Sequence, residues 1–163
     1  MSKTKEIVVI ALLAAILFIQ EQVLMFLPNI QLTVFLLIVY SRCLGLKKTL
    51  LVIVVYILLD NLVMGSFNVV FTPFVFIGWA LIPLTLCTIA KNVQVTFHLA
   101  ILAVVFALVY SWIYIIPNVI VYEFDYIAYL MADIPFEILL AVSSFITTLW
   151  LYEPCKKVLV KFL

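Results

Sequence analysis

Residues 31–60 read QLTVFLLIVYSRCLGLKKTLLVIVVYILLD, which is two apolar runs joined by a short basic turn. The basic residues of this turn are Arg42, Lys47 and Lys48. Apolar runs on both sides of a basic turn are typical of a membrane hairpin whose turn faces the cytoplasm. The stretch therefore predicts two membrane-spanning helices, at residues 32–45 and 48–64.

The first of these two runs is short for a membrane span. Its 14 residues would rise roughly 21 Å as an α-helix, whereas the hydrocarbon core of a bilayer is about 30 Å thick. Two explanations stay open. Either the helix starts earlier, near Asn29, or neighbouring helices shield it from lipid.

The rest of the chain is equally apolar. Of its 163 residues, 69% are hydrophobic and 10% are charged, against about half and about a quarter in soluble domains. Such a chain has too little polar side chain to cover a water-facing surface. We therefore predict that residues 1–163 form a single transmembrane domain with an all-α fold. Its first apolar run resembles a signal peptide, but no polar domain follows, so we expect the run to be retained.

The distribution of basic residues fixes the predicted number of spans. Four further apolar runs are long enough to cross a bilayer, at residues 6–27, 72–90, 97–117 and 134–160. With six spans, all nine Lys and Arg residues fall on one side of the membrane. The positive-inside rule makes that side cytoplasmic, together with both termini. Five or seven spans would scatter these residues over both sides.

Acidic residues follow the opposite pattern, because six of the eight map to the outer half. Glu21 and Asp60 lie inside predicted spans, where an ionisable group facing lipid costs at least about 2.5–3.5 kcal/mol. Asp133 and Glu137 lie at the outer start of the last span. We expect Asp133 to be its N-cap and Glu137 to point into a cavity. The alternative is that these acids reach headgroup water.

Polar and aromatic residues at the same depth complete a candidate ligand-binding site, since small-molecule sites combine an apolar cleft with a few convergent polar groups. The predicted ligand-binding residues are Glu21, Asp60, Asn61, Asn68, Trp79, Trp112, Tyr114, Asn118 and Glu137.

Several chemistries are excluded by what the sequence lacks. Its three glycines cannot form a GxxxxGK[ST] phosphate loop, so the chain cannot hydrolyse ATP alone. One histidine, and cysteines without CxxC spacing, argue against a metal centre. No nucleophile, base and orienting group occur together. We expect neither an enzyme nor a bound cofactor, and no nucleic-acid partner.

Small residues mark one face of the first predicted span. Ala11 and Ala15 are one helical turn apart and Ala14 is adjacent. Small residues at this spacing let a second helix approach closely. The three alanines are therefore candidate partner-docking residues, and packing within the chain's own bundle is the alternative.

Three segments, residues 11–45, 55–82 and 129–159, carry a resemblance to a known family. They read ALLAAILFIQEQVLMFLPNIQLTVFLLIVYSRCLG, VYILLDNLVMGSFNVVFTPFVFIGWALI and YLMADIPFEILLAVSSFITTLWLYEPCKKVL. Six short spans with both termini inside and an outward-facing site resemble the S component, the substrate-binding membrane subunit of energy-coupling factor (ECF) vitamin transporters. The third segment departs from a final-helix pattern of that family, which has His near Leu140 and Asn near Ser144.

The resemblance implies a function and partners. It implies a bacterial plasma-membrane protein that captures a vitamin-like small molecule from outside with high affinity. The chain would then dock, through Ala11 and Ala15, on an ECF coupling transmembrane subunit that carries two ATPase subunits, and ATP would be used there. Ligand release inside the cell would follow a toppling motion in the membrane.

The charge pattern narrows the ligand and leaves an alternative. Because no Lys or Arg lies on the outer side, we expect a neutral or cationic heterocycle rather than an anionic vitamin. The alternative function is a ligand-free six-span membrane scaffold of the rod-shape-determining type. A small multidrug-type exporter is a third reading, but Glu21 lies too far outward for it.

Overall fold

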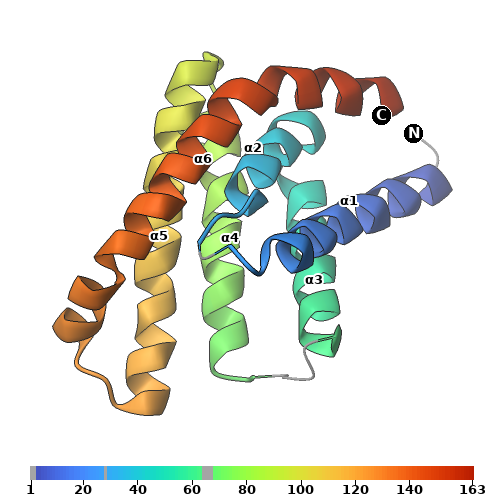
Figure 1. Cartoon of the computed structure of the whole chain (residues 1–163). Helices are drawn as coiled ribbons and strands as arrows, with labels where there is room; N and C mark the ends of the chain where they lie inside the picture. Colours follow the sequence, from blue (N-terminus) through green and yellow to red (C-terminus); the bar gives the residue numbers. More distant parts are fainter. Residues whose placement is uncertain (1–2, 28, 64–67) are drawn as a thin grey trace.

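The computed structural model describes residues 3–27, 29–63 and 68–163, and these form an all-helical bundle without strands (Figure 1). The helices are α1 (Lys3–Leu24), α2 (Thr33–Leu44), α3 (Leu46–Val63), α4 (Phe71–Cys87), α5 (Thr96–Tyr122) and α6 (Tyr126–Phe162). The all-α prediction is therefore confirmed. Among the described residues, α1, α5 and α6 are long and apolar enough to cross a membrane, which supports a membrane protein.

Helix α2 is the centre of the bundle and packs against each of the other five helices. Eight of its 12 residues are buried. The helix begins at Thr33, and Asn29 lies before it with a left-handed φ of 55°, so the possibility of an earlier start is wrong. Shielding explains the short run, because a helix enclosed by protein need not match the bilayer thickness.

Helix α6 is longer than the sequence predicts and is bent (Figure 1). It contains Pro135 and Pro154, each of which removes a backbone N–H from the helical hydrogen-bond ladder and permits a bend. Its first part lies along α5, and its last part crosses above α2 toward the start of α1. There the Lys5 ammonium donates a hydrogen bond of 3.1 Å to the carbonyl oxygen of Leu163.

The N-cap of α6 is Asp125, whose carboxylate accepts a hydrogen bond of 2.8 Å from the N–H of Ala128. The prediction that Asp133 caps this helix is therefore wrong, because Asp133 lies two turns inside it. The true start of the helix is not evident in the sequence. Residues 126–132 resemble an aromatic segment at the membrane surface, and Pro135 resembles a proline in the first turn of a helix.

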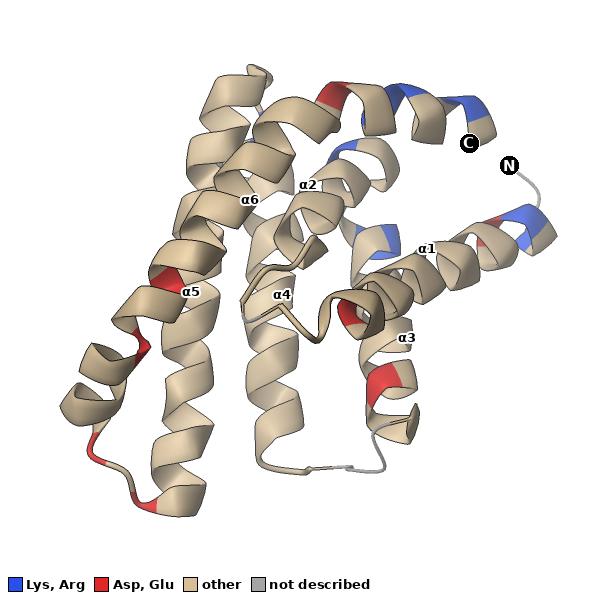
Figure 2. Ribbon diagram, viewed as in Figure 1, with Lys and Arg blue, Asp and Glu red and all other residues tan. Residues whose placement is uncertain are grey.

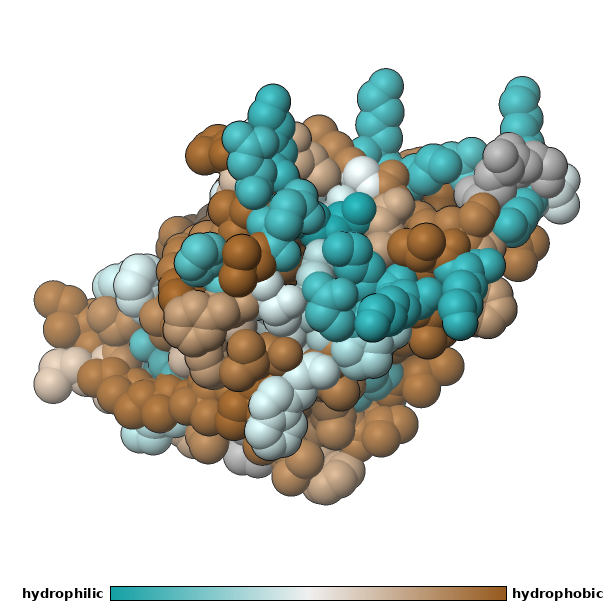
Figure 3. Space-filling model, turned by 90° about the horizontal axis from the view of Figure 1, so that it is seen from above, coloured by the Kyte–Doolittle hydropathy of each residue, from teal (hydrophilic) through white to brown (hydrophobic). Residues whose placement is uncertain are grey.

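Charges are segregated along the bundle, as the sequence predicts (Figure 2). Basic residues gather at the end that holds both chain termini, and most acidic residues lie toward the opposite end. Seen from above, hydrophilic side chains gather on the upper face, and hydrophobic surface surrounds them (Figure 3). Such polarity fits a bundle that presents one basic end to the cytoplasm.

Candidate functional site

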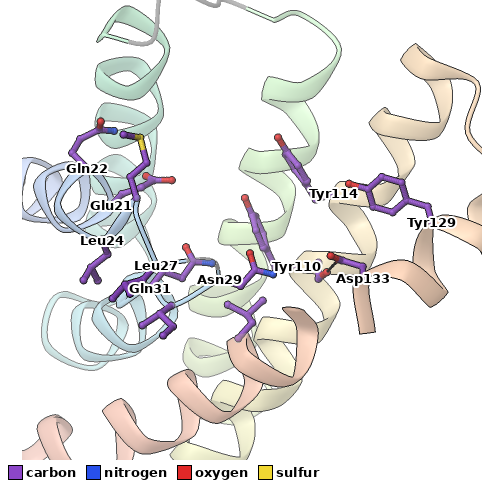
Figure 4. A pocket seen from close by; sticks show the side chains of 14 residues that line it. Glu21, Gln22, Leu24, Leu27, Asn29, Gln31, Tyr110, Tyr114, Tyr129 and Asp133 are labelled. Carbon is purple, nitrogen blue, oxygen red and sulfur yellow. Dashed lines mark hydrogen bonds between the residues drawn. The ribbon is translucent and has the colours of Figure 1, made fainter. Parts of the chain in front are cut away.

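A cavity of about 460 Å³ lies where the α1–α2 connection meets α5 and α6 (Figure 4). This volume is in the range of small-molecule sites. Its lining comes from the end of α1 and the following loop, from one face of α5 and from the outer part of α6. The lining residues are Glu21, Gln22, Leu24, Met25, Leu27, Asn29, Ile30, Gln31, Tyr110, Ser111, Tyr114, Tyr129, Asp133 and Leu140.

Carboxylates from two helices meet this cavity, and no described lining residue is a lysine or an arginine. Glu21 on α1 accepts a hydrogen bond from the Tyr56 hydroxyl on α3. The Ser111 hydroxyl on α5 lies 3.2 Å from the carboxylate of Asp133 and 3.2 Å from that of Glu137. A hydroxyl donates one proton at a time. One carboxylate of this pair therefore has capacity for another donor, which a ligand can supply.

Stacked aromatic rings form one wall. The Tyr110 ring packs on the buried Trp79 ring with centroids 3.7 Å apart and planes within 15°, and Tyr114 continues the series at 6.0 Å and 20°. Gly78 on α4 allows this close approach, because a Cβ atom there would lie 2.6 Å from Cδ2 of Tyr110. The site thus offers a stacking surface beside its carboxylates.

The loop that closes the cavity is fixed by Gln20. Its Nε2 donates to the Leu17 carbonyl at 2.9 Å and to the Thr33 hydroxyl at 2.8 Å, and its Oε1 accepts from the Leu32 N–H at 2.9 Å. This buried amide joins the end of α1 to the start of α2. The loop between them, which carries Asn29 and Gln31 to the cavity, is therefore held at both ends.

A second side-chain amide at the cavity, that of Gln22, has a hydrogen-bond donor that is unpaired within the described part of the chain. Nε2 of Gln22, which lines the cavity, is buried and has no hydrogen-bond partner among the described residues. An unpaired buried donor is destabilising by about 1–3 kcal/mol. A ligand acceptor at this position would remove that penalty.

Four of the predicted site residues belong to this site. Glu21 and Tyr114 line the cavity. Glu137 is buried and reaches the cavity through Ser111, whereas Trp79 supports Tyr110 from behind.

The other five predicted residues do not line the cavity. Asp60 and Asn61 lie on α3, where Asn61 accepts from the Thr72 hydroxyl at 3.3 Å. Asn68 instead accepts hydrogen bonds from the first N–H groups of α4. Trp112 is 44% exposed, and Asn118 donates to the Tyr114 carbonyl within its own helix.

Of the 14 described lining residues, Glu21 and Tyr114 are predicted as ligand-binding and the other twelve are not; among these twelve are Gln22, Asp133, Tyr110, Ser111 and Tyr129. One signal could have revealed the last of them. Tyr129, Asp133 and Glu137 follow each other at a spacing of four, which places them on one helical face. That face is visible in the sequence only if the last helix begins before residue 129.

The three candidate docking alanines differ in exposure. Ala14 is fully buried within the bundle, so it packs against the chain's own core and cannot meet a partner. Ala11 is exposed and Ala15 is half-buried. A docking surface on α1 can therefore include Ala11 and Ala15.

Metal binding has no support in the described part of the chain, where no three His, Cys, Asp or Glu residues are grouped closely enough to hold an ion. Comparisons with family models, with curated proteins and with solved structures find no match. The residues of the cavity are therefore the basis for assigning a function.

Proposed function

We propose that this protein is the substrate-binding membrane subunit of an ECF-type importer, an S component. The observation that carries the proposal is the cavity, which joins two carboxylates, a tyrosine stack and unpaired amide donor capacity without a basic lining residue. A ligand-free scaffold has no use for such a combination, because buried polar groups are destabilising when nothing pairs with them.

The proposed topology has six spans, with both termini in the bacterial cytoplasm. Three helices meet the length and composition of a span by themselves. Helices α2, α3 and α4 would be the other three spans. Among them α2 is short, but its neighbours enclose it. The basic end of the bundle (Figure 2) would then face the cytoplasm, and the cavity would open toward the outside.

The proposed ligand is a neutral or cationic heterocycle of vitamin size. A ring would stack on Tyr110 or Tyr114, and its N–H groups would donate to Glu21 and Asp133. The amide of Gln22 would donate to an acceptor on the same ring system. An anionic vitamin would meet two carboxylates and no lining ion-pair partner.

The proposed transport step needs partner subunits. The chain lacks a phosphate loop, so ATP hydrolysis would take place on two ATPase subunits joined by a coupling membrane subunit. Ala11 and Ala15 would form the docking surface on α1, because Ala11 is exposed and a small side chain permits close helix approach.

The test is mass spectrometry of small molecules released from protein purified in mild detergent. We expect a heterocyclic compound in wild-type protein and an amount reduced at least about tenfold in Glu21→Gln, since a charge-assisted hydrogen bond is lost. Glu123→Gln is the matched control, because Glu123 is exposed and lies outside the cavity. Release of an anionic vitamin, or of no compound from any preparation, would contradict the proposed ligand class.

A second measurement separates the importer from the scaffold. Tagged protein expressed in its native host is purified, and its partners are identified by mass spectrometry. Recovery of an ATPase pair supports the importer, and recovery of cell-wall synthesis proteins without ATPases supports the scaffold.

A further inference from the structure

An apolar groove of about 910 Å³ lies at the basic end of the molecule and shares no described lining residue with the ligand cavity. Its walls are the first turns of α1 and the last turns of α6, and α2 forms its floor. The two wall helices do not pack on each other along their described residues. They approach at their ends, where Lys5 donates to the Leu163 carbonyl.

The groove walls are hydrophobic and exposed. Leu12 on α1 is 58% exposed and Val158 on α6 is 55% exposed, and Leu36 and Val39 on α2 close the floor. An empty groove of this kind loses dispersion contacts along its whole lining. In a bilayer it is filled by something as apolar as its walls.

The end of the groove is strongly basic. Basic residues gather at this end of the bundle (Figure 2), and Glu6 of α1 and Glu153 of α6 lie next to them in the chain. Both acids are engaged, because Glu6 pairs with Lys48 at 3.5 Å and Glu153 accepts from the Thr96 hydroxyl at 3.2 Å. A hydrogen bond from a neutral hydroxyl leaves the charge of Glu153 in place, but the chain's nine lysines and arginines outnumber these two acids, so the basic end keeps an excess of positive charge.

Lys5 on α1 lines the groove itself, and further lysines lie on the same two wall helices. Lys3 is in the first turn of α1, and Lys157 and Lys161 are in the last turns of α6. All three are exposed. Lys157 and Lys161 line a second hollow on α6 together with Glu153, and their long side chains can reach a polar head that leaves the groove at this end.

We propose that this groove binds an anionic phospholipid of the inner leaflet. Its acyl chains lie between Leu12 and Val158 over α2, and its phosphate lies among the lysines of α1 and α6. Charge selects the occupant, because basic residues beside an intramembrane groove attract anionic headgroups, whereas a zwitterionic lipid gains less from them. The site does not depend on the outer cavity or on its ligand.

The test is native mass spectrometry of the full-length protein with phosphatidylglycerol and phosphatidylcholine of identical acyl chains. We expect wild-type protein to retain phosphatidylglycerol preferentially. The double variant Lys157→Gln/Lys161→Gln should lower that retention on the order of fivefold per lysine, given the attraction of one lysine for an anionic surface. Lys47→Gln/Lys91→Gln, with the same net charge but no residue on the groove walls, should retain it within about twofold of wild type.

A groove-filling variant tests the acyl-chain part. Leu12→Trp places a large ring in the groove and should lower the retention of both lipids. Ile101→Trp, at an exposed position of α5 outside the groove, should not. Helical circular dichroism and gel filtration confirm that each variant is folded. Equal retention of the two lipids, or equal losses in the two double variants, would overturn the proposal. So would a membrane protein that co-purifies with wild type and is lost in Leu12→Trp while lipid retention is unchanged.

Discussion

Tyr56 holds Glu21 in place from the neighbouring helix, and this contact gives the first prediction at the residue scale. Tyr56 is 3% exposed and donates its hydroxyl proton to Glu21. Tyr56→Phe preserves the packing but removes a hydrogen bond to a carboxylate, which is worth about 1.5–3 kcal/mol. We expect the amount of ligand recovered from purified protein to fall tenfold or more, since about 1.4 kcal/mol corresponds to a factor of ten.

The control for this variant is Tyr122→Phe. Tyr122 is 56% exposed and does not line the cavity, so loss of its hydroxyl should leave ligand recovery unchanged. If both variants retained wild-type amounts of ligand, Glu21 would not need its orienting partner and its role in binding would be in doubt.

Gly78 gives the second prediction, because its missing side chain makes room for Tyr110. In Gly78→Ala the new Cβ would lie 2.6 Å from Cδ2 of Tyr110, so the Trp79–Tyr110 stack must move. Overpacking of this kind destabilises by about 1–3 kcal/mol. We expect a lower thermal unfolding temperature in detergent together with reduced ligand recovery.

Gly45→Ala separates these two effects. Gly45 has a φ of +77°, which strains an alanine, but a Cβ there meets nothing within 4 Å. This variant should lose stability of about 1 kcal/mol and retain its ligand. Loss of ligand in Gly45→Ala would show that ligand recovery reports stability rather than the shape of the cavity.

Part of the site can be predicted from how deep each polar residue would lie in a membrane-spanning helix. Glu21 and Glu137 can be predicted because a carboxylate inside an apolar helix requires a partner, and helical rise gives its depth. Tyr110 and Ser111 cannot, since the aromatic and polar residues between positions 110 and 118 lie on more than one face of α5. Only packing against α4 and α6 decides which of its faces meets the cavity.

At the element scale, α6 shows why helix ends are harder to predict than helices. Asp125 and Asp133 both precede apolar turns, and either could cap a helix in the sequence. Pro135 favours the later start, because proline is well tolerated in a first turn. The structure instead places Pro135 inside α6, which is bent and packs along α5 (Figure 1).

The third prediction distinguishes the two aspartates. Asp125→Ala removes the N-cap, so we expect a loss of about 0.5–2 kcal/mol in stability with normal ligand recovery. Asp133→Asn keeps the size of a cavity side chain and removes its charge, so ligand recovery should fall while stability changes little. The unfolding temperature and the ligand recovery of both variants show which aspartate caps the helix and which one binds the ligand. The reverse pattern would mean that the helix begins near residue 134.

Helix α2 shows how an element can be predicted while its environment is not. Its apolar run is evident in the sequence, and both an earlier start and shielding are compatible with its length. Its contacts with all five other helices show that shielding by neighbouring helices is the right explanation for the short run. Such contacts join residues far apart in the chain, and no local pattern in residues 32–45 encodes them.

At the scale of the whole molecule, the segregated charges predict how the bundle lies in the membrane. Cys43, Cys87 and Cys155 are first replaced by serine, which leaves no native thiol. Glu123→Cys and Lys91→Cys then place one thiol at each end of the bundle. A membrane-impermeant maleimide on intact cells should label the first variant and not the second, because the proposed topology puts the basic end in the cytoplasm. Labelling of both on intact cells, or of Lys91→Cys alone, would contradict the topology.

The last prediction concerns the surface through which the whole subunit would meet its partners. Ala11 is exposed on α1, so Ala11→Trp adds a large ring outside the bundle and should leave folding and ligand recovery unchanged. The same ring would hold a partner helix away from α1, where close approach requires small residues. Overpacking at this contact would weaken docking by about 1–3 kcal/mol. Recovery of the ATPase pair and ligand uptake by cells should therefore both fall by about tenfold or more. Ile101→Trp adds an equal ring at an exposed position of α5 and should change neither ATPase recovery nor ligand uptake. If Ala11→Trp took up ligand at the wild-type rate, docking through this face of α1 would be ruled out, whereas the cavity and its ligand would stand unaffected.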